Sequence, residues 1–372
     1  MRKRWAPIAA GVLLVVMLVL CVISVAESKR ESSIKLTRSM DINHKKMEIT
    51  AYALRGQMTA DDLSKCLDGA FSLCRDYTEK YFDEESTESE LGRIADLQSK
   101  GEGGRYELSL SPLLLVRSGL ALTEFSSSAY DITAGALYRL FDDPEETPTD
   151  EEIAEALKRC GTAGLKADDN GIKLDDGVVL DLKSLADGYL CRVLEEYFVL
   201  CGISNVCVTY GDVVFVAGGK LSTQGALFWK HIEKEPFDVI LPDAYTDLKE
   251  DKIEAYDGYF AWTARPDAAA ANARYIDAQP FISSVSGEAC DHDTGSVAVM
   301  VKNDARAWYA HALSQMFLAL GKENSMKLLS SGLLESTFDL HIQYVRFEST
   351  SGETEVYRIS DQNTESTTLE AE

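Results

Sequence analysis

Three residues that can bind a ligand stand at alternate positions: Asp131, Thr133 and Gly135. They follow directly on an apolar run, 113–125, in the stretch SSSAYDITAGALYRLF. An acid and a hydroxyl in a tight turn that glycine permits can contact a ligand in a cleft. Alternatively, Asp131 only caps the helical turn that follows, as Asp and Thr commonly do. The residues alone leave both interpretations open.

The elements around this stretch predict a mixed fold. Residues 46–55 alternate as a strand does, and Thr59 is placed to cap a helix after them. Two strands flank Gly211-Asp212. Further helix starts are expected at Ser111-Pro112, Thr149 with Glu152, Ser184 and Ala305, and the last of these helices should stop at Gly321. Strands and helices do not alternate strictly, so we expect one α+β domain of mixed sheets with packed helices.

Composition excludes several function classes. The chain has 372 residues and a formal net charge of −24, so its field repels nucleic acid, and we expect no nucleic-acid partner. It has eight cysteines but neither a C-x-x-C motif nor clustered histidines, which argues against a zinc site. Cys201 and Cys207 are the only local pair worth testing as a disulfide.

The N-terminus predicts contact with a membrane. Arg2-Lys3-Arg4 precedes an apolar run that reaches Ala26, about the length that spans a bilayer core. The basic residues keep the start in the cytoplasm, so the rest should be exported. We expect residues 1–26 to be a signal-anchor, with a cleaved signal peptide as the alternative. Residues 27–39 are expected to be a linker, and the acidic tail, 348–372, to be disordered.

Four motifs occur in an order that resembles the ApbE-like FAD:protein FMN transferase family. They are SELGRIADL (89–97), SSAYDITAGALYRLF (127–141), VLDLKSLADGYL (179–190) and YGDVVFVAGG (210–219). The resemblance implies an ApbE-like domain over 40–347, which takes FAD as its substrate. It also implies that a magnesium or another divalent metal ion helps transfer FMN to a threonine or serine of an acceptor flavoprotein. That acceptor would be a membrane redox subunit or an extracytoplasmic reductase of the bacterial cell envelope.

The resemblance also assigns site residues. It implies catalytic roles for Asp131, Thr133 and Asp187, and a metal site at Ala186, His311 and Gln315. The residues implied to bind FAD are Met40, Asp131, Gly135, Asp181, Gly188, Tyr210, Gly211, Asp212 and Thr263. The free amides and the positive dipole end of the helix that begins near Ser184 would suit phosphate.

Departures from the family pattern gather at the implied metal and pyrophosphate positions. Asp187 stands where the family usually has lysine, and Tyr210 replaces a glycine. His311 and Gln315 replace Asp and Thr ligands, and magnesium rarely accepts imidazole. The alternative function is therefore a catalytically impaired relative that serves as a flavin-binding or scaffold ectodomain. Because each motif is short, an unrelated α+β ectodomain that binds lipid or peptidoglycan is a further alternative.

Overall fold

The structure is a computed structural model. It describes residues 15–19, 22, 32–141, 148–224, 231–241, 251–264, 282–288, 290, 293–302, 305–351, 353–360 and 363–369. Most of the predicted signal-anchor, 1–26, lies outside these residues. Within the described ranges, none of the helices combines the length and the apolar character that crossing a bilayer requires.

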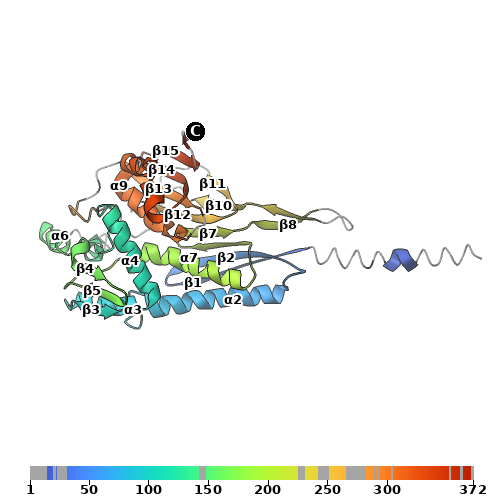
Figure 1. Ribbon diagram of the computed structural model, residues 1–372, viewed down its shortest axis with the longest axis horizontal. Coiled ribbons are helices and arrows are strands. Elements are labelled where there is room, and N and C mark those ends of the chain that lie inside the picture. Colours follow the sequence, from blue (N-terminus) through green and yellow to red (C-terminus); the bar gives the residue numbers. More distant parts are fainter. Residues whose placement is uncertain are drawn as a thin grey trace, which may run out of the picture.

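A nine-stranded antiparallel sheet forms the centre of the molecule (Figure 1). Its spatial order is β1 (Ser33–Ile42), β2 (Lys45–Leu54), β6 (Val206–Tyr210), β7 (Val213–Ala217), β12 (Gly258–Ala264), β13 (Thr294–Val301), β14 (Ile342–Ser349), β15 (Thr354–Ser360) and β16 (Asn363–Leu369). Three smaller sheets surround it: β3 (Gly104–Glu107) with β5 (Gly171–Leu174) and β4 (Leu165–Ala167), β8 (Lys220–Gln224) with β9 (His231–Glu235), and β10 (Phe237–Leu241) with β11 (Asp251–Ala255).

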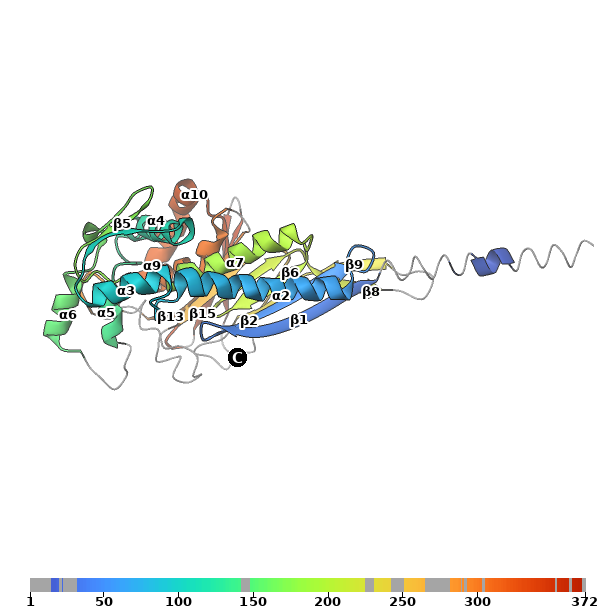
Figure 2. The same ribbon diagram turned by 90° about the horizontal axis from the view of Figure 1, so that it is seen from below.

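Helices cover one face of the large sheet. The helices are α2 (Ala60–Tyr77), α3 (Glu90–Ser99), α4 (Leu110–Phe125), α5 (Gly135–Tyr138), α6 (Asp150–Leu157), α7 (Lys183–Leu200), α9 (Ala310–Ser330) and α10 (Leu333–Phe338). Shorter turns are η2 (Thr78–Phe82), η3 (Arg139–Phe141), η4 (Thr162–Gly164) and η6 (Ala307–Tyr309). Helix α2 packs on β1 and β2, α7 on β6 and β7, and α9 on β12 and β13 (Figures 1 and 2). The expected α+β domain is confirmed.

The two faces of the sheet differ in chemistry, as strand β2 shows. Met47, Ile49 and Ala51 are fully buried in the main core beneath the helices. The residues between them, Glu48, Thr50 and Tyr52, point to the opposite face and line a pocket. Side chains alternate across a strand, so one strand can build the core and a binding surface together.

Several predicted helix boundaries are confirmed and others shift. The helix expected from Ala305 to Gly321 instead begins at Ala310, and at Gly321, where φ is 71°, it kinks and then continues to Ser330. Thr59 caps α2, and Thr149 with Glu152 forms a capping box on α6. Helix α4 begins after Ser109 rather than at Ser111, and Glu90 accepts hydrogen bonds from the Ser109 amide and hydroxyl. The Leu182 cap of α7 likewise lies two residues before Ser184.

Both ends of the predicted domain are corrected. Strand β1 starts at Ser33, inside the predicted linker, because it pairs with β2 along its whole length and buries Ile34. The tail, predicted to be disordered, forms β15 and β16. The polar composition of the tail suggested disorder, but strands at a sheet edge can contain many Ser, Thr and Glu residues. Here the backbone of β15 pairs with β14 and β16, and Val356 is buried.

The predicted cysteine pair is not the one that the fold brings together. The seven described cysteines are free, and Cys207 lines the pocket described below. The thiol of Cys201 instead contacts Cys66, where α7 packs on α2. Burial and this contact raise the pKa of Cys66 to about 11, so its thiol stays protonated near neutral pH.

Candidate active site

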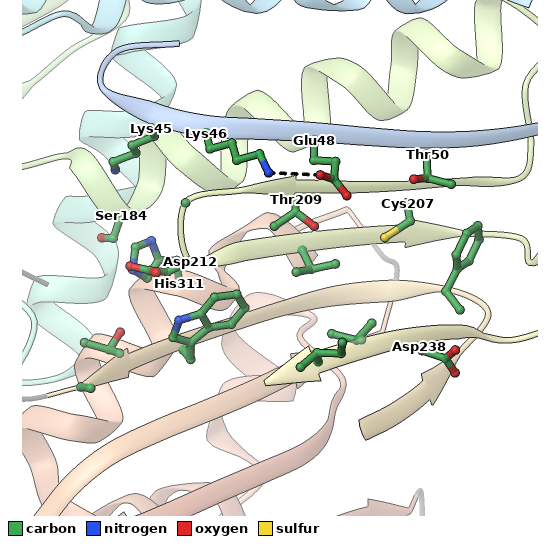
Figure 3. Close-up of a pocket in the computed structure, with 18 of the residues that line it drawn as sticks. Lys45, Lys46, Glu48, Thr50, Ser184, Cys207, Thr209, Asp212, Asp238 and His311 are labelled. Carbon is green, nitrogen blue, oxygen red and sulfur yellow. Dashed lines mark ion pairs between the residues drawn. The ribbon is translucent and has the colours of Figure 1, made fainter. Parts of the chain in front are cut away.

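A large pocket runs along the strand face that the helices leave free and around the strand ends (Figure 3). Its volume of about 920 Å³ is near the upper end of the range for small-molecule sites. Strands β2, β6, β7, β10 and β12 supply one part of its wall, and α7 and α9 supply Ser184, His311 and Gln315. The pocket therefore has the size for an extended ligand.

The two parts of the pocket have different character. Tyr52, Phe237 and Trp262 give an aromatic wall, in which the Tyr52 and Phe237 rings meet edge to face with centroids 5.8 Å apart. The part at the strand ends is polar, with His44, Lys45 and the α7 and α9 side chains. Aromatic walls suit planar rings, and lysines suit phosphate. The pocket matches a ligand that has both.

An ion cluster connects three elements at the polar part. Lys45 Nζ, from the start of β2, lies 2.7 Å from Asp187 Oδ2 on α7. His311 Nδ1, on α9, lies 3.4 Å from the same oxygen; this nitrogen is buried and has no hydrogen-bond partner among the described residues. Burial of Asp187 opposes ionisation, but the interactions with Lys45 and His311 together outweigh it and hold the pKa of Asp187 below its usual value.

The residues at the implied metal site do not fit a divalent metal. Within the described ranges, no three His, Cys, Asp or Glu side chains gather closely enough to hold a metal ion. Magnesium prefers charged oxygen ligands, whereas His311 offers a nitrogen and Gln315 an uncharged amide. The nearby carboxylate, Asp187, already binds the ammonium group of Lys45.

Two backbone amides at the start of α7 are already hydrogen-bonded. Asp181 Oδ1 accepts the Lys183 amide at 3.2 Å, and the carboxylate of Glu84 accepts a backbone hydrogen bond from Leu182. Burial and the neighbouring charge of Asp181 raise the pKa of Glu84 to about 7. Two acids thus accept the Leu182 and Lys183 amides at the positive end of the helix. Binding of phosphate at this helix start stays a prediction.

Asp131 and Thr133 lie beside the large pocket and bind each other. Asp131 is buried; its Oδ1 accepts hydrogen bonds from the Thr133 amide at 2.8 Å and hydroxyl at 2.6 Å, and its Oδ2 accepts the Gly161 amide at 3.0 Å. These bonds hold the turn together. Asp131 lines a small cavity that shares Ser184 and Gln315 with the large pocket. Asp131 therefore stabilises the loop next to the large pocket through these hydrogen bonds.

Two of the predicted glycines serve close packing. A Cβ atom at Gly135 would lie 2.8 Å from the carbonyl oxygen of Val179, and one at Gly188 would overlap the carbonyl oxygen of Trp308. Both glycines let one backbone approach another, which fixes the loop at 131–135 and helix α7 in place.

The other predicted residues divide between pocket and core. Gly211, Asp212 and Thr263 line the large pocket, and Thr263 shares a 2.7 Å hydrogen bond with Ser314. Tyr210 is buried in the core, where its hydroxyl donates to the carbonyl oxygen of Ile42, so it does not face a ligand in the large pocket. Met40 is exposed on the edge strand and lines no part of the large pocket. These two assignments are corrected.

The sequence prediction missed residues that shape the pocket, above all Lys45 and Trp262. A signal existed for Trp262, because it stands in the strand-like run GYFAWTA, next to the predicted Thr263. Lys45 gave none, since it follows a turn in which Asn43 and His44 have φ values of 48° and 60°, and lysines beside turns are usually solvated.

Comparisons with known proteins agree with this geometry. The sequence model of the ApbE family matches residues 44–338. The fold is similar to a flavin transferase ApbE from Vibrio cholerae (TM-score 0.65, 17% identity, covering 90% of this chain and 97% of that one) and to a flavinyl transferase ApbE from Pseudomonas stutzeri (0.65, 15%, 90% and 94%). It is also similar to an ApbE protein from Thermotoga maritima (0.66, 18%, 86% and 96%). Among curated proteins, none matches.

Proposed function

The chain belongs to the ApbE family, and we propose that it is a flavin transferase that takes FMN from FAD and attaches it to a hydroxyl group of an acceptor flavoprotein. The observation that carries this proposal is the two-part pocket. An aromatic wall that includes Trp262 is continuous with a polar part that contains Lys45 and His311. FAD has the matching chemistry, because it joins flat rings through a charged pyrophosphate.

The transfer needs one bond to form and one to break. The oxygen of an acceptor threonine or serine attacks the phosphorus atom of the FMN part, the bond from that phosphorus to the bridging oxygen breaks, and AMP leaves with that oxygen. The hydroxyl proton goes to His311, the imidazole that lines the pocket beside Ser184 and Gln315. Asp187 Oδ2, 3.4 Å from Nδ1, favours the positive charge that the ring gains when it takes the proton.

We place this reaction outside the cytoplasm. The basic start and the apolar run of 1–26 support a membrane-anchored protein with an extracytoplasmic domain. The acceptor in this proposal is a membrane redox subunit or an extracytoplasmic reductase, which the protein would meet at the same membrane.

Covalent flavin is the direct test. The full-length protein is incubated with FAD and an exported redox subunit that contains an acceptor threonine, once with magnesium and once with EDTA. We expect a UV-fluorescent acceptor band that survives denaturing electrophoresis, together with an equal amount of released AMP. FAD binding without either product would refute the transfer.

Two observations favour a second candidate, a flavin-binding protein that does not transfer FMN. Glu84 and Asp181 occupy the start of α7, and the donor set does not fit magnesium. In that case FAD raises the melting temperature, since it binds only the folded state, but no adduct forms.

A further inference from the structure

We propose that Lys45, held in place by Asp187, supplies the positive charge that receives the pyrophosphate of the substrate, so that binding needs no divalent metal ion. This inference rests on the proposed function for the identity of the ligand. It gives the binding of pyrophosphate to Lys45 in β2, a strand that lies outside the four motifs that carry the family resemblance.

The fold fixes Lys45 at the polar part of the pocket. The β1–β2 hairpin turns at Asn43 and His44, and β2 is locked in register on β6, where Met47 pairs with Tyr210. Gly211 makes room for the lysine: a Cβ atom there would lie 3.2 Å from Lys45 Cδ. Lys45 Nζ also lies 6.0 Å from the centre of the Tyr210 ring. The aliphatic part of the Lys45 side chain therefore packs at the ends of β2 and β6, and its ammonium group reaches α7.

Asp187 anchors the ammonium group but does not bury it. The Asp187 side chain is 6% exposed, whereas that of Lys45 is 33% exposed and lines the large pocket. A lysine held at one side by a carboxylate is a preorganised point charge, and ammonium groups bind phosphate in this way. Asp187, which departs from the family pattern, thus acts as the positioning residue for Lys45.

The charges around the pocket favour an anion. Its lining includes five lysines, Lys35, Lys45, Lys46, Lys183 and Lys220, against three carboxylates, Glu48, Asp212 and Asp238. This excess of positive charge occurs in a chain with a net charge of −24. A divalent cation at the polar part would meet the ammonium group of Lys45, whereas a pyrophosphate would be attracted by it.

The test measures binding rather than turnover. The full-length protein is titrated calorimetrically with FAD, with riboflavin, which has no phosphate, and with inorganic pyrophosphate, each in EDTA and in magnesium. We expect FAD and pyrophosphate to bind in EDTA. We expect Lys45→Gln to weaken both by roughly tenfold to thirtyfold and Lys45→Arg to restore part of the loss, while riboflavin affinity stays within about twofold.

A matched control is Lys65→Gln, which removes a lysine from an exposed pair with Asp61 on α2 and should change no affinity. The inference is overturned if FAD binds only with magnesium or if Lys45→Gln binds FAD as the wild type does; FAD binding itself then leaves the proposed function standing. If FAD fails to bind under every condition, the proposed function fails. The inference survives that result only if pyrophosphate binds in EDTA and needs Lys45.

Discussion

Lys45 Nζ and Asp187 Oδ2 lie 2.7 Å apart and join the β1–β2 hairpin to helix α7 across the strand ends. This ion pair closes the polar part of the pocket on the side of the main core, and His311 approaches the same carboxylate. The pair therefore links the stability of the hairpin to the chemistry that we assign to the pocket.

Asp187→Asn should destabilise the protein by about 2 kcal/mol. This is less than the 3–5 kcal/mol typical of a fully buried pair, because Lys45 is one-third exposed and solvent screens its charge. The free energy of unfolding is measured by urea titration. Glu48→Gln, which breaks the exposed pair with Lys46, is the control and should cost less than about 1 kcal/mol. Equal losses of unfolding free energy in the two variants would show that the Lys45–Asp187 pair stabilises the protein no more than an exposed pair does.

His311→Asn should slow covalent FMN transfer by about 10²–10⁴-fold while FAD affinity changes little, because the variant removes a proton acceptor and keeps a polar side chain of similar reach. Transfer is measured as covalent flavin formed per minute, and affinity by calorimetry. His341→Asn, near Glu335 and outside the pocket, is the control. If both histidine variants transfer FMN at the wild-type rate, another group takes the proton.

Local patterns predicted the elements well. Alternation fixed the strand that the structure places at Lys45–Leu54, and polar caps located α2 and α6, because both signals act over a few residues. The ordered motifs also identified the loop at Asp131 and the start of α7, and the structure brings these two segments together around Ser184 and Gln315.

What the sequence could not predict depends on partners far along the chain. Asp131 resembles a ligand-binding acid until the Gly161 amide, 30 residues away, takes its second oxygen. Lys45 looks like an ordinary turn lysine until Asp187, 142 residues away, is placed beside it. Likewise, the polar tail forms strands because β14 offers an edge to pair with.

Gly188→Ala should destabilise the protein by about 1–3 kcal/mol, because the added methyl group would overlap the backbone of Trp308 and force α7 away from η6. The measurement is thermal unfolding followed by circular dichroism. Gly104→Ala in β3 is the matched control, since its methyl group would meet no atom within 4 Å, and we expect a change of less than about 1 kcal/mol. A melting temperature unchanged by Gly188→Ala would contradict the close approach.

Glu84→Gln tests the acids at the start of α7 through the pH dependence of stability. The pKa of Glu84 is raised to about 7 in the fold from an ordinary value of 4.5. Between these values the folded state keeps a proton that the unfolded state has lost, so the wild type loses stability as pH rises from 4.5 to 7.

The glutamine variant lacks this loss. Its unfolding free energy relative to wild type should therefore increase by about 1–3 kcal/mol from pH 4.5 to 7 and then stay level. Urea titrations at five pH values measure the difference. A difference that does not vary with pH would mean that Glu84 ionises normally in the folded protein.

A crystal structure of the full-length protein with FAD, grown in EDTA, would show directly whether Lys45 receives the pyrophosphate. We expect FAD along the large pocket, with a pyrophosphate oxygen within hydrogen-bond distance of Lys45 Nζ and a ring of the dinucleotide against Trp262. FAD bound elsewhere, or its pyrophosphate placed at Asp131 and away from Lys45, would contradict this expectation.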